Sequence, residues 1–209
     1  ALIAPPLGKA AMKIGEVIML ATNLQPFLMG IVVSVLVGAA LTLPISSAAI
    51  CAAFGLTGLA GGAAVAGCCA QMIGFAVMSF KENGWGGLVS QGIGTSMLQM
   101  GNIIKNPRIW IAPIVTSAIT GPVATCLFKL QMNGTAVSSG MGTCGFVGQI
   151  GVYSGWVNDV AAGTKSAITM MDWAGLILIS FILPAVICPL INWLLKKAGW
   201  VKDGDMKLS

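Results

Sequence analysis

The chain has 209 residues, of which 56 % are hydrophobic and 8 % are charged, with a formal net charge of +5 and a mean hydropathy of +0.92. Because average soluble domains are about 25 % charged, these proportions leave too few polar side chains to cover a water-exposed surface, and they predict an all-α integral membrane protein in a lipid bilayer. The chain has no histidine, which excludes imidazole metal sites and histidine-assisted nucleophiles, and its cations flank apolar stretches, which argues against a nucleic-acid partner.

The amino terminus does not have the pattern of a signal peptide. Ala1 is not an initiator methionine, and residues 1–9 lack the basic, apolar and small-residue regions of a signal peptide in that order. We therefore expect the chain to begin inside a longer polypeptide and to form a single membrane domain over residues 1–209.

Apolar stretches of membrane-spanning length recur along the chain. A transmembrane helix needs about 20 apolar residues, and the first such run is bounded by Pro26, where proline is tolerated, and by Pro44, which ends it. The next apolar window, 48–80, is too long for one straight crossing, so its glycine-rich first part predicts an irregular lead-in. We expect four transmembrane helices, over residues 26–43, 63–80, 109–128 and 173–195.

Prolines interrupt the third and fourth of these spans. Pro113 and Pro122 lie in the third, and Pro184 and Pro189 lie in the fourth. Because a proline inside a helix frees a backbone carbonyl, we expect both helices to be kinked and to pack against protein as well as lipid.

Two uncharged segments between the spans, residues 83–102 and 131–158, are rich in Gly, Ser, Thr, Asn and Gln. Facing lipid, such segments would leave non-helical backbone groups unbonded, whereas lining a cavity they would not. We expect two re-entrant hairpins; the alternative is a pair of polar loops outside the membrane, since loops also favour Gly and Asn.

Charge supports the re-entrant arrangement. If both hairpins return to the side they left, four spans place nine cations on one face and leave Lys129 and Lys165 on the other. The nine are Lys9, Lys13, Lys81, Lys105, Arg108, Lys196, Lys197, Lys202 and Lys207. By the positive-inside rule the nine-cation face, with both termini of this chain, is expected to be cytoplasmic in a multi-pass plasma-membrane protein.

Amides and hydroxyls in the two hairpins are the candidate solute ligands. They offer donors and acceptors without fixed charge, which suits a neutral polyhydroxylated solute better than an ion. The candidates are Gln91, Thr95, Gln99 and Asn102 in one segment and Asn133, Thr135, Ser138 and Gln149 in the other, with Ser90, Ser139 and Thr143 beside them. The alternative is that these groups only hydrogen-bond the broken backbone. No catalytic residue, metal ligand or cofactor is expected.

The acids and cysteines are expected to be structural. Glu82 follows Lys81 at a span end, and Asp159 and Asp172 bracket Lys165 outside the spans, so no acid lies deep enough to favour a proton relay or a cation-coupled carrier. The six cysteines lie in apolar or glycine-rich runs without C-x-x-C spacing, which is typical of small buried hydrophobes.

Several runs resemble one family of membrane proteins. They are Leu24–Gly30 (LQPFLMG), Leu43–Ile50 (LPISSAAI), Gly58–Ala64 (GLAGGAA), Met97–Arg108 (MLQMGNIIKNPR), Ile119–Pro122 (ITGP) and Gly140–Gly142 (GMG). The chain up to about Leu195 resembles enzyme IIC, the membrane subunit of the phosphoenolpyruvate-dependent sugar phosphotransferase system, in the branch also described as toxin-regulator membrane proteins.

The resemblance implies that the chain is the C-terminal part of a longer bacterial protein. It implies re-entrant hairpins around a sugar, a homodimer, and cytoplasmic IIA and IIB partner domains that carry the phosphoryl group while the membrane subunit is not phosphorylated. The glutamate and histidine sugar-binding motif of the glucose and lactose branches is not present, so no binding residue is carried over.

Two functions follow as hypotheses. The first is a translocation subunit that binds a sugar-like solute between the polar hairpins and alternates its exposure between the faces of the membrane. The second is a membrane-embedded sensor or regulator that binds a small molecule and transports nothing. A purely structural bundle gives no reason for two uncharged polar segments at membrane depth.

Overall fold

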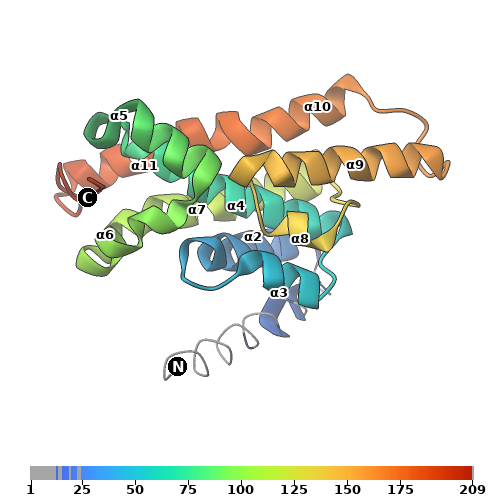
Figure 1. Ribbon diagram of the computed structural model, residues 1–209, viewed down its shortest axis with the longest axis horizontal. Helices are drawn as coiled ribbons and strands as arrows, with labels where there is room; N and C mark the ends of the chain where they lie inside the picture. Colours follow the sequence, from blue (N-terminus) through green and yellow to red (C-terminus); the bar gives the residue numbers. More distant parts are fainter. Residues whose placement is uncertain (1–12, 14–15, 19, 23–24, 209) are drawn as a thin grey trace.

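The computed structural model describes residues 13, 16–18, 20–22 and 25–208. In this part of the chain every regular element is helical, apart from one isolated antiparallel bridge between Gly58 and Met132. The long helices run along the long axis of the molecule (Figure 1). Three described helices are long and apolar enough to cross a membrane, Gly58–Met78, Pro107–Leu127 and Met170–Lys197, and the apolar helix α2, Pro26–Thr42, is shorter. The all-α membrane fold is thereby confirmed.

Helix α4, Gly58–Met78, is the centre of the bundle. In its most apolar 18-residue stretch, 89 % is buried inside the protein. The reason is that α2 and α7, Ile111–Pro122, both pack directly on it. Glycines make these contacts close: a Cβ on Gly67 of α4 would meet the backbone of Ser34 in α2. Small residues at helix crossings are the usual means by which membrane helices approach each other.

The glycine-rich start of this region is helical, which corrects the expected irregular lead-in and a helix beginning near residue 63. Residues 58–62 already belong to α4, and a Cβ on Gly62 would meet the carbonyl group of Leu130. Tertiary packing against that backbone outweighs the low helix propensity of glycine. Helix α4 then ends at Met78, short of the predicted residue 80.

A short helix, α3 (Ser47–Ala53), changes the path of the chain before α4. It lies beside α2 and α8 (Figure 1) and returns the chain to the end where α2 began. Helices α2 and α4 are therefore parallel: Ser34 packs on Gly67, and Thr42 bonds Gln71 one turn further along α4. Pro26, bonded to Thr125, lies at the end opposite Lys81, which corrects the expected alternation of four antiparallel spans.

The two proline-containing spans are continuous helices with π-helical turns. The third joins a 3-10 turn, Pro107–Trp110, to α7 and then to the π turn Val123–Leu127, which follows Pro122. The last joins α10, Met170–Ile177, to the π turn Leu178–Ile182 and α11, Leu183–Lys197. Pro184 has no N–H for an earlier carbonyl, and a π turn is one way to accommodate that loss.

The two polar segments form helical hairpins. The first hairpin comprises α5 (Phe80–Val89), a π turn (Ser90–Gly94), a break at Thr95, a 3-10 turn (Ser96–Gln99) and α6 (Met100–Lys105). The second hairpin comprises residues 130–161, with α8 (Ala136–Ser139), a 3-10 turn (Cys144–Phe146) and α9 (Val147–Ala161). The hairpins enter from opposite ends of the molecule (Figure 1).

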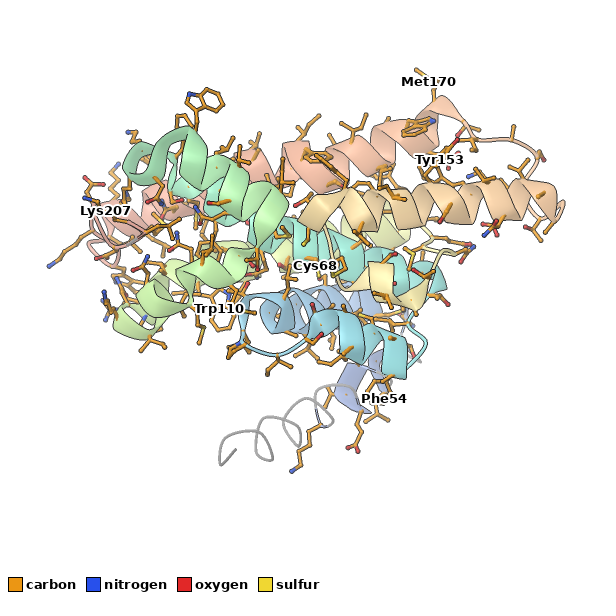
Figure 2. The ribbon with its side chains drawn as sticks, in the orientation of Figure 1. Phe54, Cys68, Trp110, Tyr153, Met170 and Lys207 are labelled. Carbon is orange, nitrogen blue, oxygen red and sulfur yellow. The ribbon has the colours of Figure 1, made fainter. Side chains whose placement is uncertain are left out.

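The tips of the hairpins meet at the middle. The Thr143 hydroxyl of the second hairpin donates to the Gly92 carbonyl of the first at 2.6 Å. We call the end that holds Lys105 and the chain's C-terminal segment the C-terminal end, and the end that holds Gly58 and Lys129 the opposite end. Figure 2 places Lys207 at the former and Met170 toward the latter.

Candidate functional site

The candidate ligands of the two hairpins lie in three separate places. Gln91, Gln99 and Asn102 lie toward the C-terminal end, Asn133 lines a cavity at the opposite end, and the other four bond protein groups outside that cavity. The groove between the two hairpin tips is apolar, with Val89, Ile93 and Phe146 among its lining residues and a volume of about 220 Å³. The eight predicted side chains therefore do not form one pocket.

Toward the C-terminal end, three amides form a chain of hydrogen bonds. Gln99 Nε2 donates to Gln91 Oε1 at 2.8 Å, and Asn102 Nδ2 donates to Gln99 Oε1 at 2.8 Å. Gln91 and Gln99 are fully buried, and Gln91 also donates to the hydroxyl of Ser79 at 2.9 Å. The three amides are thus oriented by one another, which fixes where their remaining donors point.

Those remaining donors bond the C-terminal segment, which we define as residues 198–208. Gln99 Nε2 donates to the Met206 carbonyl at 3.0 Å, and Asn102 Nδ2 donates to the Lys207 carbonyl at 3.0 Å. The side-chain amide of Asn83 binds the same stretch through both its polar atoms: Nδ2 donates to Met206 O, and Oδ1 accepts the N–H of Leu208.

Glu82 anchors this segment as well. Its two carboxylate oxygens accept the backbone N–H groups of Gly204 at 3.0 Å and Met206 at 2.9 Å. Its ion-pair partner is Lys196, at 3.8 Å, and not Lys81, the cation next to it in the sequence. Lys196 also donates to Asp203 at 2.6 Å, and this contact holds the pKa of Asp203 below its ordinary value.

A polar cavity of about 530 Å³ opens at the opposite end. It is lined by Phe128, Lys129, Leu130, Gln131, Asn133, Trp156, Asp159, Thr164, Lys165 and Asp172. Asn133 is the one predicted ligand in its wall, and its Nδ2 donates to Asp159 Oδ2 at 2.7 Å. Since α9 carries Asp159 and the loop after it carries Thr164 and Lys165, the cavity forms where the second hairpin meets the start of α10.

The charges of this cavity balance. Lys165 pairs with Asp172 at 2.6 Å, and its ammonium lies 5.5 Å from the centre of the Trp156 ring. Asp159 and Lys129 supply the second carboxylate and the second ammonium. The wall thus combines amides, two carboxylates, two ammonium groups and the half-buried ring of Phe128, a set that offers donors and acceptors to hydroxyl groups without net charge.

Most of the remaining candidates bond groups close to them in sequence, whereas Ser139 bonds the distant carbonyl of Leu56. The hydroxyls of Thr135 and Ser138 lie 2.8 Å apart and bond each other, and Thr95 Oγ1 accepts the N–H of Met97 at the tip of the first hairpin. Ser90 and Ser139 donate to backbone carbonyls. For these residues the structural interpretation, hydrogen bonding of broken backbone, describes the contacts that the structure contains.

Gln149 differs because one of its polar atoms has no partner. Its Nε2 donates to Ser180 Oγ at 3.0 Å and lies 3.3 Å from Cys69 Sγ, which joins α9 to the π turn of the last span and to α4. Its buried Oε1 atom accepts no hydrogen bond from the described residues. A buried acceptor without a donor costs about 1–3 kcal/mol, so this amide is held in place at the expense of one hydrogen bond.

Gln71 is the central polar residue that sequence reasoning missed. It is fully buried in α4, where its Oε1 accepts from Trp110 Nε1 at 2.8 Å and from Thr42 Oγ1 at 3.1 Å, and its Nε2 donates to Ser117 at 3.4 Å. Thr42 in turn bonds Ser96 of the first hairpin at 2.9 Å. The sequence does offer a signal for this residue, because Gln71 is a single amide side chain within an otherwise apolar span.

Comparison with known proteins identifies a family. Residues 1–208 match the family model described as "Phosphotransferase system, EIIC". Among curated proteins and among solved structures, nothing matches the chain.

Proposed function

Because the chain belongs to the phosphotransferase system EIIC family, we propose that it binds a neutral, sugar-like solute in the cavity at the opposite end. Membership of that family supports a membrane subunit for sugar transport. The observation that carries this proposal is the wall of that cavity. Asn133 and Asp159 present a bonded amide and carboxylate, and Trp156 lies beside them. Trp156 itself is only 2 % exposed, beneath the Lys165 ammonium, so the half-buried Phe128 supplies the apolar surface of the wall. Paired polar groups beside an aromatic ring suit a solute that has hydroxyls at its edge and an apolar face.

The orientation follows from the cations. Seven of the eleven cations, Lys81, Lys105, Arg108, Lys196, Lys197, Lys202 and Lys207, lie on the first hairpin, the last helix and the residues that flank them. Of the other two cations of the expected nine-cation face, Lys9 lies outside the described residues, and Lys13 precedes α2, which begins at the opposite end. Lys129 and Lys165 line the cavity at the opposite end. The positive-inside rule then makes the C-terminal end cytoplasmic and the cavity outward-facing. Cytoplasmic IIA and IIB partner domains would bind at the C-terminal end, and the assembly would be a homodimer.

Transport would move the solute between the two hairpins toward the amides of the first one. Hairpins that enter from opposite ends and meet at their tips supply two separable gates, as in transporters built around broken helices. The bond between Thr143 and Gly92 is the contact that such a movement would have to break or carry along.

The test is solute binding by the purified protein. A panel of hexoses, hexitols and disaccharides is screened by thermal stabilisation and then titrated, first against the unaltered chain. Asn133→Ala and Asp159→Ala should each weaken the affinity for the binding sugar by about tenfold or more, since each loses a hydrogen bond worth about 1.4 kcal/mol or more to a charged or polar partner. Thr135→Ala is the matched control, because Thr135 bonds only Ser138 outside the cavity. Equal affinities of all three variants would contradict the site.

A regulator that binds a solute without transporting it is the second candidate. The observation that favours it is the C-terminal segment, which closes the C-terminal end with bonds from Glu82, Asn83 and Gln99. In proteoliposomes, flux of the panel sugar that stabilises the protein supports the transporter, and stabilisation without flux supports the regulator.

A further inference from the structure

The C-terminal segment occupies a site built of polar side chains and an apolar floor. The side chain of Met206 is fully buried, with an exposed fraction of 0 %, and it packs in one cluster with Phe75, Ile103 and Ile109. Around it the main chain from Gly204 to Leu208 is bonded by side chains of the first hairpin. A short stretch of turns is therefore held by side chains, as a bound peptide would be.

The bonds run from side chains to main chain. Among the described residues, the main-chain to main-chain bonds of residues 204–208 are turns within the segment, such as Lys207 N–H to Gly204 O. The segment is joined to α11 through Gly199, whose φ is +73°, and it turns again at Gly204, whose φ is +98°. Lys202, Asp203 and Lys207 are exposed on its outer side. Glycines in the left-handed region allow the chain to turn sharply at both points, so the segment can detach without unfolding the helices beneath it.

Detachment would uncover the amides that the sequence predicts as solute ligands. The carbonyl oxygens of Met206 and Lys207 accept from Gln99 and Asn102, as the hydroxyl oxygens of a sugar would. Glu82, which accepts two N–H groups of the segment, would accept two hydroxyl donors equally well. The vacated place would have an apolar floor and a polar rim, as solute sites commonly do.

We propose that residues 200–208 are a plug that fills, within the same chain, a second solute site on the first hairpin, formed by Glu82, Asn83, Gln99 and Asn102, and that the plug leaves when solute occupies this site. The inference rests on the proposed function for the identity of the solute, and it does not rest on it for the release of the plug. The two sites then lie at opposite ends of the molecule, one open and one occupied by the protein itself.

Release is measured with a cysteine at the buried position of the plug. In a Cys126→Ala background, which removes the exposed native thiol, Met206→Cys is labelled with a membrane-impermeant maleimide, and Lys207→Cys gives the rate for an exposed neighbour. We expect Met206→Cys to react to completion, about tenfold or more slowly than Lys207→Cys, at a rate that levels off with reagent concentration, because opening then limits labelling. Equal rates, or no labelling while denatured protein labels fully, would overturn the plug.

A second variant tests the contacts that hold it. Glu82→Ala removes the acceptor of two backbone N–H groups and should raise the labelling rate of Met206→Cys by about tenfold. Glu16→Ala, which removes an exposed acid elsewhere, should leave the rate unchanged. A Glu82→Ala chain that labels no faster than the Glu16→Ala chain would show that these bonds do not hold the segment, contrary to the proposal.

Solute competition separates this inference from the proposed function. Glucose, mannitol and lactose are added in turn at saturating concentration during labelling, and a sugar that binds the second site should accelerate the labelling of Met206→Cys. If a sugar binds with an affinity that depends on Asn133 but leaves labelling unchanged, the plug does not compete with solute and the inference fails alone. If no sugar binds while Met206→Cys still labels slowly and to completion, the proposed function fails and the release of the segment stands.

Discussion

Gln71 illustrates how single polar residues organise this apolar bundle. Its amide contacts Thr42 of α2, Trp110 at the start of the third span and Ser117 of α7. Thr42 lies on α2, and Trp110 and Ser117 both lie on the third span, so one side chain fixes the relative position of two segments that pack on α4. Because lipid tails are as apolar as helix side chains, the hydrophobic effect does not drive membrane helices together, and hydrogen bonds between polar side chains are one of the interactions that do.

Replacing this amide should destabilise the fold. Gln71→Leu keeps the volume but leaves the N–H of Trp110 without its acceptor. Thr42 and Ser117 keep their bonds to Ser96 and to the Pro113 carbonyl. We therefore expect a loss of about 1–3 kcal/mol in the free energy of unfolding. Thermal unfolding in detergent measures it. Gln25→Leu is the control, because Gln25 is exposed before α2, and it should leave the midpoint unchanged. A Gln71→Leu midpoint equal to that of Gln25→Leu would show that the network carries no net stability.

Residue types in the hairpins could be predicted from the sequence, but their partners could not. Gln99 and Asn102 stand out as uncharged donors near a span, and in the structure their amides bond the C-terminal segment. Their partners are carbonyls 107 and 105 residues further along the chain, and no local pattern indicates a contact of that separation. The cysteines were simpler, since burial follows from apolar neighbours: Cys51, Cys68, Cys69 and Cys188 are buried, although Cys126 is exposed.

At the scale of elements, glycines decide which helices can approach. A Cβ on Gly67 would meet the backbone of Ser34, whereas one on Gly101 in α6 would meet nothing within 4 Å. The same residue type is therefore required at a crossing and dispensable on an exposed helix face.

Alanine at these two positions should have opposite effects. Gly67→Ala forces α2 away from α4, which we expect to cost about 1–3 kcal/mol as overpacking does. Gly101→Ala should be neutral or stabilise the protein by up to about 0.5–1 kcal/mol, because alanine loses less conformational freedom in a helix. Unfolding midpoints of the two variants check the pair, and a Gly67→Ala chain as stable as the parent would mean that the crossing is looser than the structure has it.

The bond between the hairpin tips can be tested in the same way. Thr143→Val keeps the shape and removes the hydroxyl that donates to Gly92, leaving a buried carbonyl without its donor at a cost of about 1–3 kcal/mol. Thr143→Ser keeps the hydroxyl and should retain most of that stability. Unfolding midpoints of the Val and Ser chains are compared; no difference between them would exclude a stabilising role for this hydrogen bond.

Element predictions succeeded where the signal was local. Pro26 and the apolar run after it mark α2 almost to the residue, because a proline start and continuous apolar side chains are properties of the segment itself. The start of α4 at Gly58 was missed, since it depends on Leu130, which is distant in sequence. The short helix α3 was missed for a similar reason: its seven residues are too few to show a period.

For the whole molecule, α3 has the largest consequence. Because α3 brings the chain back before α4 begins, α2 and α4 run in the same direction. Successive apolar runs therefore do not always alternate in direction across the bundle. The sequence of α4, first hairpin, α7 and second hairpin then repeats one pattern in opposite directions (Figure 1). Such an inverted pair is the arrangement in which transporters place a solute path between two broken segments.

Labelling from the two sides of the membrane tests this arrangement. Single cysteines replace Gln25, Lys165 and Lys202 in the Cys126→Ala background, and intact cells are compared with inverted vesicles, both treated with a membrane-impermeant maleimide. Thr125 bonds Pro26, and Lys165 lines the cavity at that same opposite end, so the cysteines at 25 and 165 should label from outside. The cysteine at 202 should label from the cytoplasmic side, where the positive-inside rule places the seven cations. If the cysteine at 25 labels together with that at 202, α2 and α4 are antiparallel in the membrane, and the bundle described here does not hold.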